Sequence, residues 1–125
     1  MSTHSTQALI PFERLQAFIA GTLQHVGLPA ADAQQVATLM AQADLQGSDG
    51  HGVLRLPQYV KRIRAGGINV RPQMQVVHER PGSAVLDGDN GMGHLVMSRA
   101  AEIAIEKART CGIGWVGSRL SNHAG

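Results

Sequence analysis

The segment SAVLDGDNGMG, residues 83–93, decides the fold class of this chain. Its first half, residues 83–87, is a short apolar run typical of a strand, and a glycine-rich passage follows it. Residues 94–110 then carry apolar side chains at helical spacing, and Gly112 provides a stop. A second apolar run at 113–116 predicts another, buried strand. Strand, helix and strand in this order form a βαβ-like unit, which favours an α/β fold over an all-helical one.

The residues before this unit show helical periodicity. Residues 12–26 repeat apolar side chains every three or four positions, which predicts a first helix. A second helix is predicted between Pro29 and Gly47, and a third over about 53–65. A further strand is expected at 74–78, before a proline-glycine turn. The chain therefore reads as about three helices, then short strands and the βαβ-like unit.

The composition indicates one globular domain that does not bind nucleic acid. A chain of 125 residues is long enough to bury a hydrophobic core. The net charge of +2 is too small to argue for nucleic acid. Lys61, Arg62 and Arg64 form a basic cluster, but no aromatic side chains alternate with them to stack on bases. We interpret this cluster as a solvated helix face.

Cysteine usage and the N-terminus indicate the compartment. Cys111 is the single cysteine, so an internal disulfide is excluded, and we expect it to pack as a small buried apolar residue. Residues 1–9 show no basic segment followed by an apolar run, and we expect them to be disordered. No stretch approaches the roughly 20 apolar residues of a membrane span. We therefore predict a cytoplasmic protein with no membrane partner.

Several common types of site are not supported. The six histidines form no His-x-x-x-His pair and have no cysteine nearby, so we predict no metal site. No Gly-x-Ser-x-Gly motif of a serine hydrolase is present. The spacing of Gly88, Gly91 and Gly93 differs from the dinucleotide fingerprint Gly-x-Gly-x-x-Gly. A tight connecting turn is therefore favoured there over a phosphate site.

His51 and Arg55 form the first candidate site. If the chain is helical from His51 onward, residues four apart share a face, and the two side chains point the same way. Histidine exchanges a proton near neutral pH, and arginine binds a carboxylate with two parallel hydrogen bonds. The pair therefore suits proton transfer on a small hydroxy or keto acid. The alternative is a helix-capping His51 and an Arg55 in a surface ion pair.

Two further positions could complete this site. Tyr59 lies one turn beyond Arg55 and could form a pocket wall, or it could be a core aromatic residue with its hydroxyl at the surface. Asn122 and His123 follow the predicted strand at 113–116. Loop residues at that end of a strand commonly reach the ligand in α/β proteins.

Several segments together resemble the malate/L-lactate dehydrogenase family, whose fold is not the Rossmann fold. They occur in family order across about residues 10–125. The matching segments are Ala43-Asp44-Leu45-Gln46-Gly47, His51-Gly52-Val53-Leu54-Arg55-Leu56-Pro57, Arg64-Ala65-Gly66-Gly67-Ile68-Asn69, Leu86-Asp87-Gly88-Asp89-Asn90-Gly91-Met92-Gly93 and Ser121-Asn122-His123-Ala124-Gly125.

The resemblance implies NAD- or NADP-dependent interconversion of a 2-hydroxy acid and its 2-keto acid, or reduction of a cyclic imino acid. It implies that His51 is the acid/base histidine and that Arg55 binds the substrate carboxylate; Tyr59 remains a substrate-binding candidate from its spacing alone. Asn122 and His123 would lie at the nicotinamide, and in some members the histidine equivalent to His123 is the proton acceptor. The assignment between the two histidines stays open. Gly50 stands where the family commonly has serine, which argues against the imino-acid reductases.

Members of that family are considerably longer than 125 residues. We therefore expect a truncated N-terminal portion, inactive or nearly so in isolation, with a non-catalytic remnant as the alternative. Residues 10–67 would be the helical substrate side, and 68–125 the incomplete start of the cofactor-binding domain. The resemblance also implies a homodimer for the complete protein.

Overall fold

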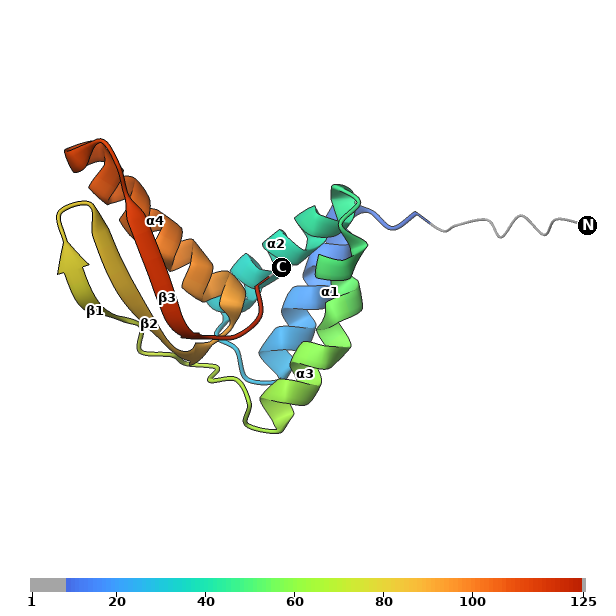
Figure 1. Ribbon diagram of the computed structural model, residues 1–125. Coiled ribbons are helices and arrows are strands. Elements are labelled where there is room, and N and C mark those ends of the chain that lie inside the picture. Colours follow the sequence, from blue (N-terminus) through green and yellow to red (C-terminus); the bar gives the residue numbers. More distant parts are fainter. Residues whose placement is uncertain (1–8, 125) are drawn as a thin grey trace, which may run out of the picture.

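The computed structural model describes residues 9–124, which form four α-helices, two short 3-10 helices and a three-stranded sheet (Figure 1). In chain order the elements are α1 (Phe12–His25), α2 (Ala30–Leu45), η1 (Asp49–His51), η2 (Val53–Arg55), α3 (Leu56–Arg64), β1 (Gln75–Arg80), β2 (Ser83–Gly91), α4 (Gly93–Cys111) and β3 (Trp115–Ser121). The predicted α/β class is confirmed. The predicted disorder of residues 1–9 falls almost wholly outside the described residues; Leu9 is exposed and has no regular structure.

Local sequence signals place the first two helices. Pro11 and Pro29 occupy the N-cap positions of α1 and α2, each with a φ of −56° that leads directly into a helix. After each helix a glycine turns the chain in the left-handed region, Gly27 at φ +110° and Gly47 at φ +78°. Both predicted helices are therefore confirmed.

The third predicted helix is broken at its start. Residues 49–55 form two 3-10 turns, and only Leu56–Arg64 is α-helical. Between the turns Gly52 is extended, with φ −91° and ψ −146°. A helix running from His51 onward is therefore wrong, and helical spacing does not set the relative directions of His51 and Arg55.

The sheet has the order β1-β2-β3, with β2 in the centre. Strands β1 and β2 are antiparallel, whereas β2 and β3 are parallel and joined by α4, so the predicted βαβ unit is confirmed. Strand β2 continues to Gly91, so most of the glycine-rich passage is strand rather than loop. This extension brings the end of β2 beside the end of β3, where Gly91 pairs with Ser121.

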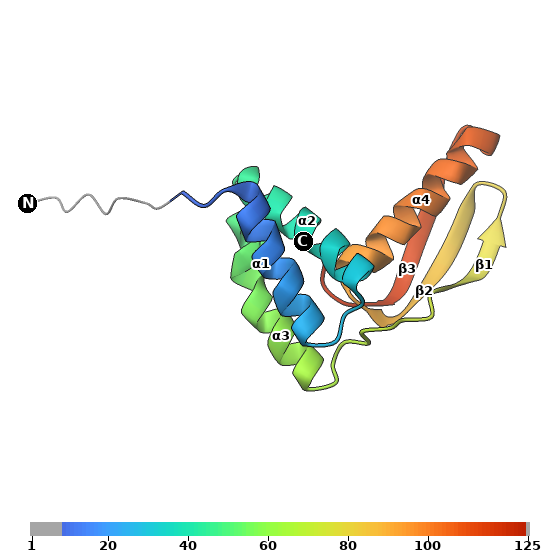
Figure 2. The ribbon, with the colours of Figure 1, turned by 180° about the vertical axis from the view of Figure 1, so that it is seen from behind.

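Two clusters of buried side chains hold the molecule together. The larger joins α1, α2, α3 and the start of α4, around Ile19, Met40 and Tyr59. The smaller lies between the sheet and α4, around Leu86 and Val96. In Figures 1 and 2 the three N-terminal helices form one half of the molecule, and α4 with the sheet forms the other. The C-terminal segment returns from the sheet to the helices.

Two burial expectations were wrong. Strand β3 is largely exposed, and 64% of Trp115 is accessible, because β3 is an edge strand within residues 9–124. Cys111 ends α4 and is exposed. The basic residues of α3 are exposed, as expected for a solvated face. None of the described helices combines the length and the hydrophobicity required to cross a membrane.

Candidate active site

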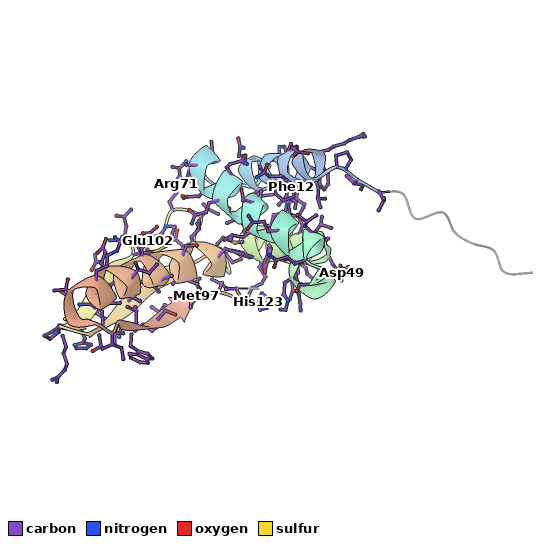
Figure 3. The ribbon with its side chains drawn as sticks, turned by 90° about the horizontal axis from the view of Figure 1, so that it is seen from above. Phe12, Asp49, Arg71, Met97, Glu102 and His123 are labelled. Carbon is purple, nitrogen blue, oxygen red and sulfur yellow. The ribbon has the colours of Figure 1, made fainter. Side chains whose placement is uncertain are left out.

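Four aromatic side chains from distant parts of the chain meet where the C-terminal segment reaches the helices. They are His51, Tyr59, His94 and His123. They come from η1, α3, α4 and the residues after β3. In the view of Figure 3, His123 lies between Met97 of α4 and the turn that carries Asp49.

Tyr59 is the buried centre of this group. Its hydroxyl lies 2.9 Å from Nδ1 of His123, and only 2% of the residue is exposed. Burial raises the pKa of the Tyr59 hydroxyl, and the nearby Arg55 charge lowers it by less. The hydroxyl therefore stays protonated near neutral pH and can donate its hydrogen to the histidine.

The rings of His51 and His123 are parallel. Their centroids lie 5.9 Å apart and their planes differ by 8°. Both side chains are exposed, and the His51 ring makes no hydrogen bond within the described residues. The two candidate acid/base histidines are therefore neighbours.

His94 is the member of the group that no sequence pattern predicted. It is the second residue of α4, is only 4% exposed, and meets the Tyr59 ring edge-on at a centroid distance of 5.5 Å. Burial, together with the charges of His123 and His51, lowers the pKa of His94 to about 4. In the sequence it resembled an ordinary helix start, and only its place after the glycine-rich passage could have drawn attention.

Arg55 is held by the loop that precedes it. Its Nε donates to the Gly50 carbonyl at 2.7 Å, and a terminal nitrogen donates to Oε1 of Gln58 at 3.0 Å. The Asp44 carboxylate fixes this loop by accepting the Val53 N–H at 2.7 Å. A Cβ on Gly52 would overlap the Asp44 carboxylate, so this approach requires glycine.

Asn122 fastens the segment that carries His123. Its Nδ2 donates to the Asn90 backbone and side-chain oxygens at 2.8 and 2.9 Å, and to the Gly91 carbonyl at 3.2 Å. A Cβ on Gly93 would overlap the backbone of Asn122 and His123, so this segment lies directly over the start of α4. Gly88 and Gly91 lie in β2, and only Met92 separates β2 from α4, so this connection is shorter than the turn that the sequence favoured.

Two cavities flank the aromatic group. The smaller, of about 170 Å³, brings Arg55, Tyr59, Asn122 and His123 together. The larger, of about 430 Å³, is lined by His51 and His94. Thus Arg55 shares its cavity with His123, whereas His51 lines the neighbouring cavity.

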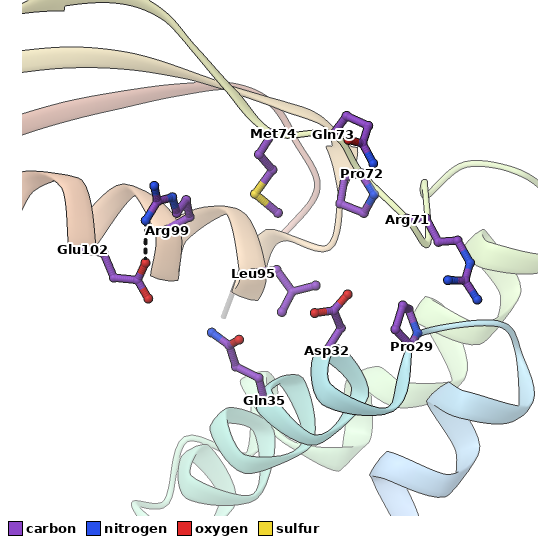
Figure 4. A pocket seen from close by; sticks show the side chains of 10 residues that line it. All are labelled: Pro29, Asp32, Gln35, Arg71, Pro72, Gln73, Met74, Leu95, Arg99 and Glu102. Carbon is purple, nitrogen blue, oxygen red and sulfur yellow. Dashed lines mark hydrogen bonds and ion pairs between the residues drawn. The ribbon is translucent and has the colours of Figure 1, made fainter.

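A third cavity, of about 530 Å³, lies between α2, α4 and residues 71–74 (Figure 4). Its polar lining residues are exposed apart from the half-buried Asp32, and Arg99 pairs with Glu102 at 3.0 Å. It contains no histidine, and we do not assign it to the site. Within residues 9–124, no group of three or more histidine, cysteine or acidic side chains could hold a metal ion.

The fold and the site define an α/β protein in which an arginine shares a cavity with a tyrosine and a histidine. The sequence pattern of the malate/L-lactate dehydrogenase family matches residues 10–125, and the chain belongs to this family. It is 47% identical to malate dehydrogenase from Pyrococcus abyssi over 93% of this chain and 32% of that protein. It is 41% identical to L-sulfolactate dehydrogenase from Methanocaldococcus jannaschii over 90% of this chain and 33% of that protein.

The solved structures agree with this assignment. The structure of malate dehydrogenase from Pyrococcus horikoshii superposes with a TM-score of 0.92 at 44% identity, covering 94% of this chain and 34% of that one. The likeness to the non-Rossmann dehydrogenase fold is therefore confirmed for this part of it. The chain spans about a third of the length of the relatives it matches.

Proposed function

We propose that this chain supplies the substrate-binding and proton-transfer side of an oxidoreductase that interconverts a malate- or lactate-like 2-hydroxy acid and its 2-keto acid. The observation that carries the proposal is the small cavity that joins Arg55, Tyr59 and His123, with His51 stacked beside it. Family membership supports the same chemistry.

Arg55 binds the substrate carboxylate. Its guanidinium has no carboxylate partner within residues 9–124, and its two hydrogen bonds there leave other N–H groups available. A guanidinium that grips a carboxylate through two parallel hydrogen bonds fixes the orientation of the adjacent carbonyl carbon. Tyr59 forms the wall of the cavity between Arg55 and His123.

A histidine of the stacked pair transfers the proton. In the reducing direction, a bound NADH or NADPH would supply the hydride for the carbonyl carbon, and this chain would have to supply the proton for the carbonyl oxygen. We assign the proton to His51, whose ring nitrogens make no hydrogen bond within the described residues. His123, held through Nδ1 by Tyr59, is the second candidate and lies closer to the carboxylate site.

The residues present suit the nicotinamide end of such a cofactor. The 430 Å³ cavity next to His51 is lined by apolar, amide, hydroxyl and imidazole groups, with no acidic or basic side chain apart from histidine. The reduced nicotinamide ring is uncharged and bears an amide, which matches this lining. Asn122 lines the smaller cavity instead, where it would contribute through its Oδ1, because its Nδ2 is engaged by the end of β2.

The choice among substrates rests on position 50. Gly50 offers only its backbone, and its carbonyl accepts the Arg55 Nε. No hydroxyl at this position can join a proton relay to His51, which favours a 2-keto acid over a cyclic imino acid.

For the complete protein we further propose a cytoplasmic homodimer. Sedimentation would test the oligomeric state, and cell fractionation would test the location.

The test is turnover by the complete protein that contains this chain. We expect oxidation of NADH or NADPH with pyruvate or oxaloacetate, and a rise of at least tenfold in KM in the variant Arg55→Lys, because lysine cannot reproduce the two-point contact. Arg64→Lys, at the exposed end of α3, is the matched control and should leave KM unchanged. A folded protein that reduces no 2-keto acid with either cofactor would contradict the proposal.

A further inference from the structure

His94 is the most unusual polar residue of the described chain. It is the only buried histidine within residues 9–124, and its Nδ1 is the single buried side-chain nitrogen or oxygen there without a hydrogen-bond partner. A buried polar atom without a partner costs free energy, and an aromatic hydrocarbon ring at this position would avoid that cost. The other ring nitrogen, Nε2, also has no hydrogen-bond partner within residues 9–124 but is not fully buried, so it is the atom of this ring that a ligand can reach.

The environment of His94 decides its protonation. The ring is buried against Tyr59 and feels the charges of His51 and His123, so its pKa of about 4 keeps it neutral at neutral pH. A neutral imidazole has one N–H and one acceptor nitrogen. Because an orphaned N–H is rarer in proteins than an orphaned acceptor, the proton belongs on Nε2 and the lone pair on the buried Nδ1.

The cavity beside His94 indicates what this N–H would meet. The 430 Å³ space has a partly apolar wall, including Leu39 and Met97, and amide or hydroxyl groups from Gln42 and Ser98. Its lining has no lysine or arginine, so an anionic group would go to the Arg55 cavity instead. An uncharged carbonyl oxygen can enter here and accept a hydrogen bond.

We infer that His94 is a neutral hydrogen-bond donor, through Nε2–H, to a carbonyl oxygen of the ligand bound in the cavity beside His51. The inference rests on the proposed function for the identity of that ligand. Two sources share this chemistry: the keto oxygen of the substrate and the amide oxygen of the nicotinamide.

The first test is nitrogen NMR of the histidine rings in the protein as expressed from its own gene. We expect the Nε2–H tautomer for His94 in the free protein. The two probes are oxamate, an unreactive pyruvate isostere, and nicotinamide mononucleotide. We expect the His94 Nε2 signal to shift when the probe whose oxygen accepts its hydrogen bond is added. An Nδ1–H tautomer, or no shift with either probe, would overturn the inference.

The second test uses two variants. His94→Phe keeps a ring against Tyr59 but removes the donor, and should weaken binding of the responsive probe about tenfold without lowering thermal stability. His94→Gln restores a donor and should recover part of the affinity. Equal probe binding by wild type and His94→Phe would refute the inference. If neither variant folds, the tautomer and the probe-induced shift of His94 in the wild-type protein test the inference.

The outcomes separate this inference from the proposed function. Probe binding through His94 in a protein that turns over no 2-keto acid leaves the inference standing and rejects the function. If His94→Phe turns over a 2-keto acid with the kcat and KM of the wild type, the proposed function stands and the inference about His94 is rejected.

Discussion

The Tyr59 hydroxyl and Nδ1 of His123 lie 2.9 Å apart although 64 positions separate them in the chain. This hydrogen bond ties the C-terminal segment to α3 and orients the His123 ring beside His51. It joins a side chain from the helical half of the molecule to one that follows the sheet. The candidate site therefore exists only when both halves are folded and packed together.

Replacing Tyr59 by phenylalanine tests this contact. The ring against His94 stays, but His123 loses its hydroxyl partner, so we expect a loss of about 1 kcal/mol in the free energy of unfolding. We also expect kcat/KM for a 2-keto acid to fall about tenfold, because the imidazole is no longer held. Denaturant unfolding and steady-state kinetics measure the two effects. An unchanged histidine NMR spectrum in Tyr59→Phe would show that the hydroxyl does not orient His123.

The loop before Arg55 should not tolerate a side chain at Gly52. In Gly52→Ala the new methyl group overlaps the Asp44 carboxylate, which must then leave the Val53 N–H. We expect a loss of roughly 1–3 kcal/mol in the free energy of unfolding, measured with urea. Gly21→Ala is the control, since a Cβ at this helical position meets no atom within 4 Å. The free energy of unfolding of that variant should be unchanged or higher by up to about 1 kcal/mol. Equal effects of the two substitutions would show that the Asp44 carboxylate does not exclude a side chain at Gly52.

His94 should make the fold sensitive to acid. The unfolded chain binds a proton at this residue near pH 6.5, whereas the folded chain does so only near pH 4. Stability is therefore complete above about pH 6.5 and falls as the pH drops from 6.5 to 4. At about 1.4 kcal/mol per unit, the full loss from this one group is about 3 kcal/mol.

Urea unfolding across that pH range measures the effect. The loss should be much smaller in His94→Phe, which has no proton to bind. His78→Gln, on the exposed face of β1, is the matched control and should retain the wild-type pH dependence. An equal pH dependence in wild type and His94→Phe would exclude His94 as its source.

Asn122 should control the position of His123. Asn122→Ala removes the three side-chain hydrogen bonds to the end of β2 and keeps the one from the backbone N–H, and we expect a loss of about 1–2 kcal/mol in the free energy of unfolding. Because the segment over α4 is then released, the NMR signals of Tyr59 and His123 should shift. Ser118→Ala serves as the control, since this exposed hydroxyl of β3 contacts only the Met97 sulfur, at 3.5 Å. Unshifted Tyr59 and His123 signals in Asn122→Ala would contradict the role.

The helices and the βαβ unit could be predicted because their signals are local. Proline at the helix starts, glycine after the helix ends and apolar spacing within them act over a few residues. The break at Gly52 could not be predicted in this way. It depends on the Asp44 carboxylate, which reaches the Val53 N–H from α2.

The burial of β3 was mispredicted for a related reason. An apolar run favours a strand, but whether the strand is covered depends on its neighbours in the sheet. Within the described residues β3 pairs only with β2, so Trp115 stays exposed.

By itself, the sequence determined the order of the elements, the α/β class and the family, together with the residue types that suit a hydroxy-acid site. The tertiary structure decided which of these side chains lie next to one another. Spacing paired His51 with Arg55, but packing places Arg55 with Tyr59 and His123, and His51 with His94. His94 had no distinguishing signal, because its burial arises only when α4 packs against the N-terminal helices. Local periodicity forms helices and strands, whereas the burial of an imidazole and its pKa depend on atoms that lie far away in the chain.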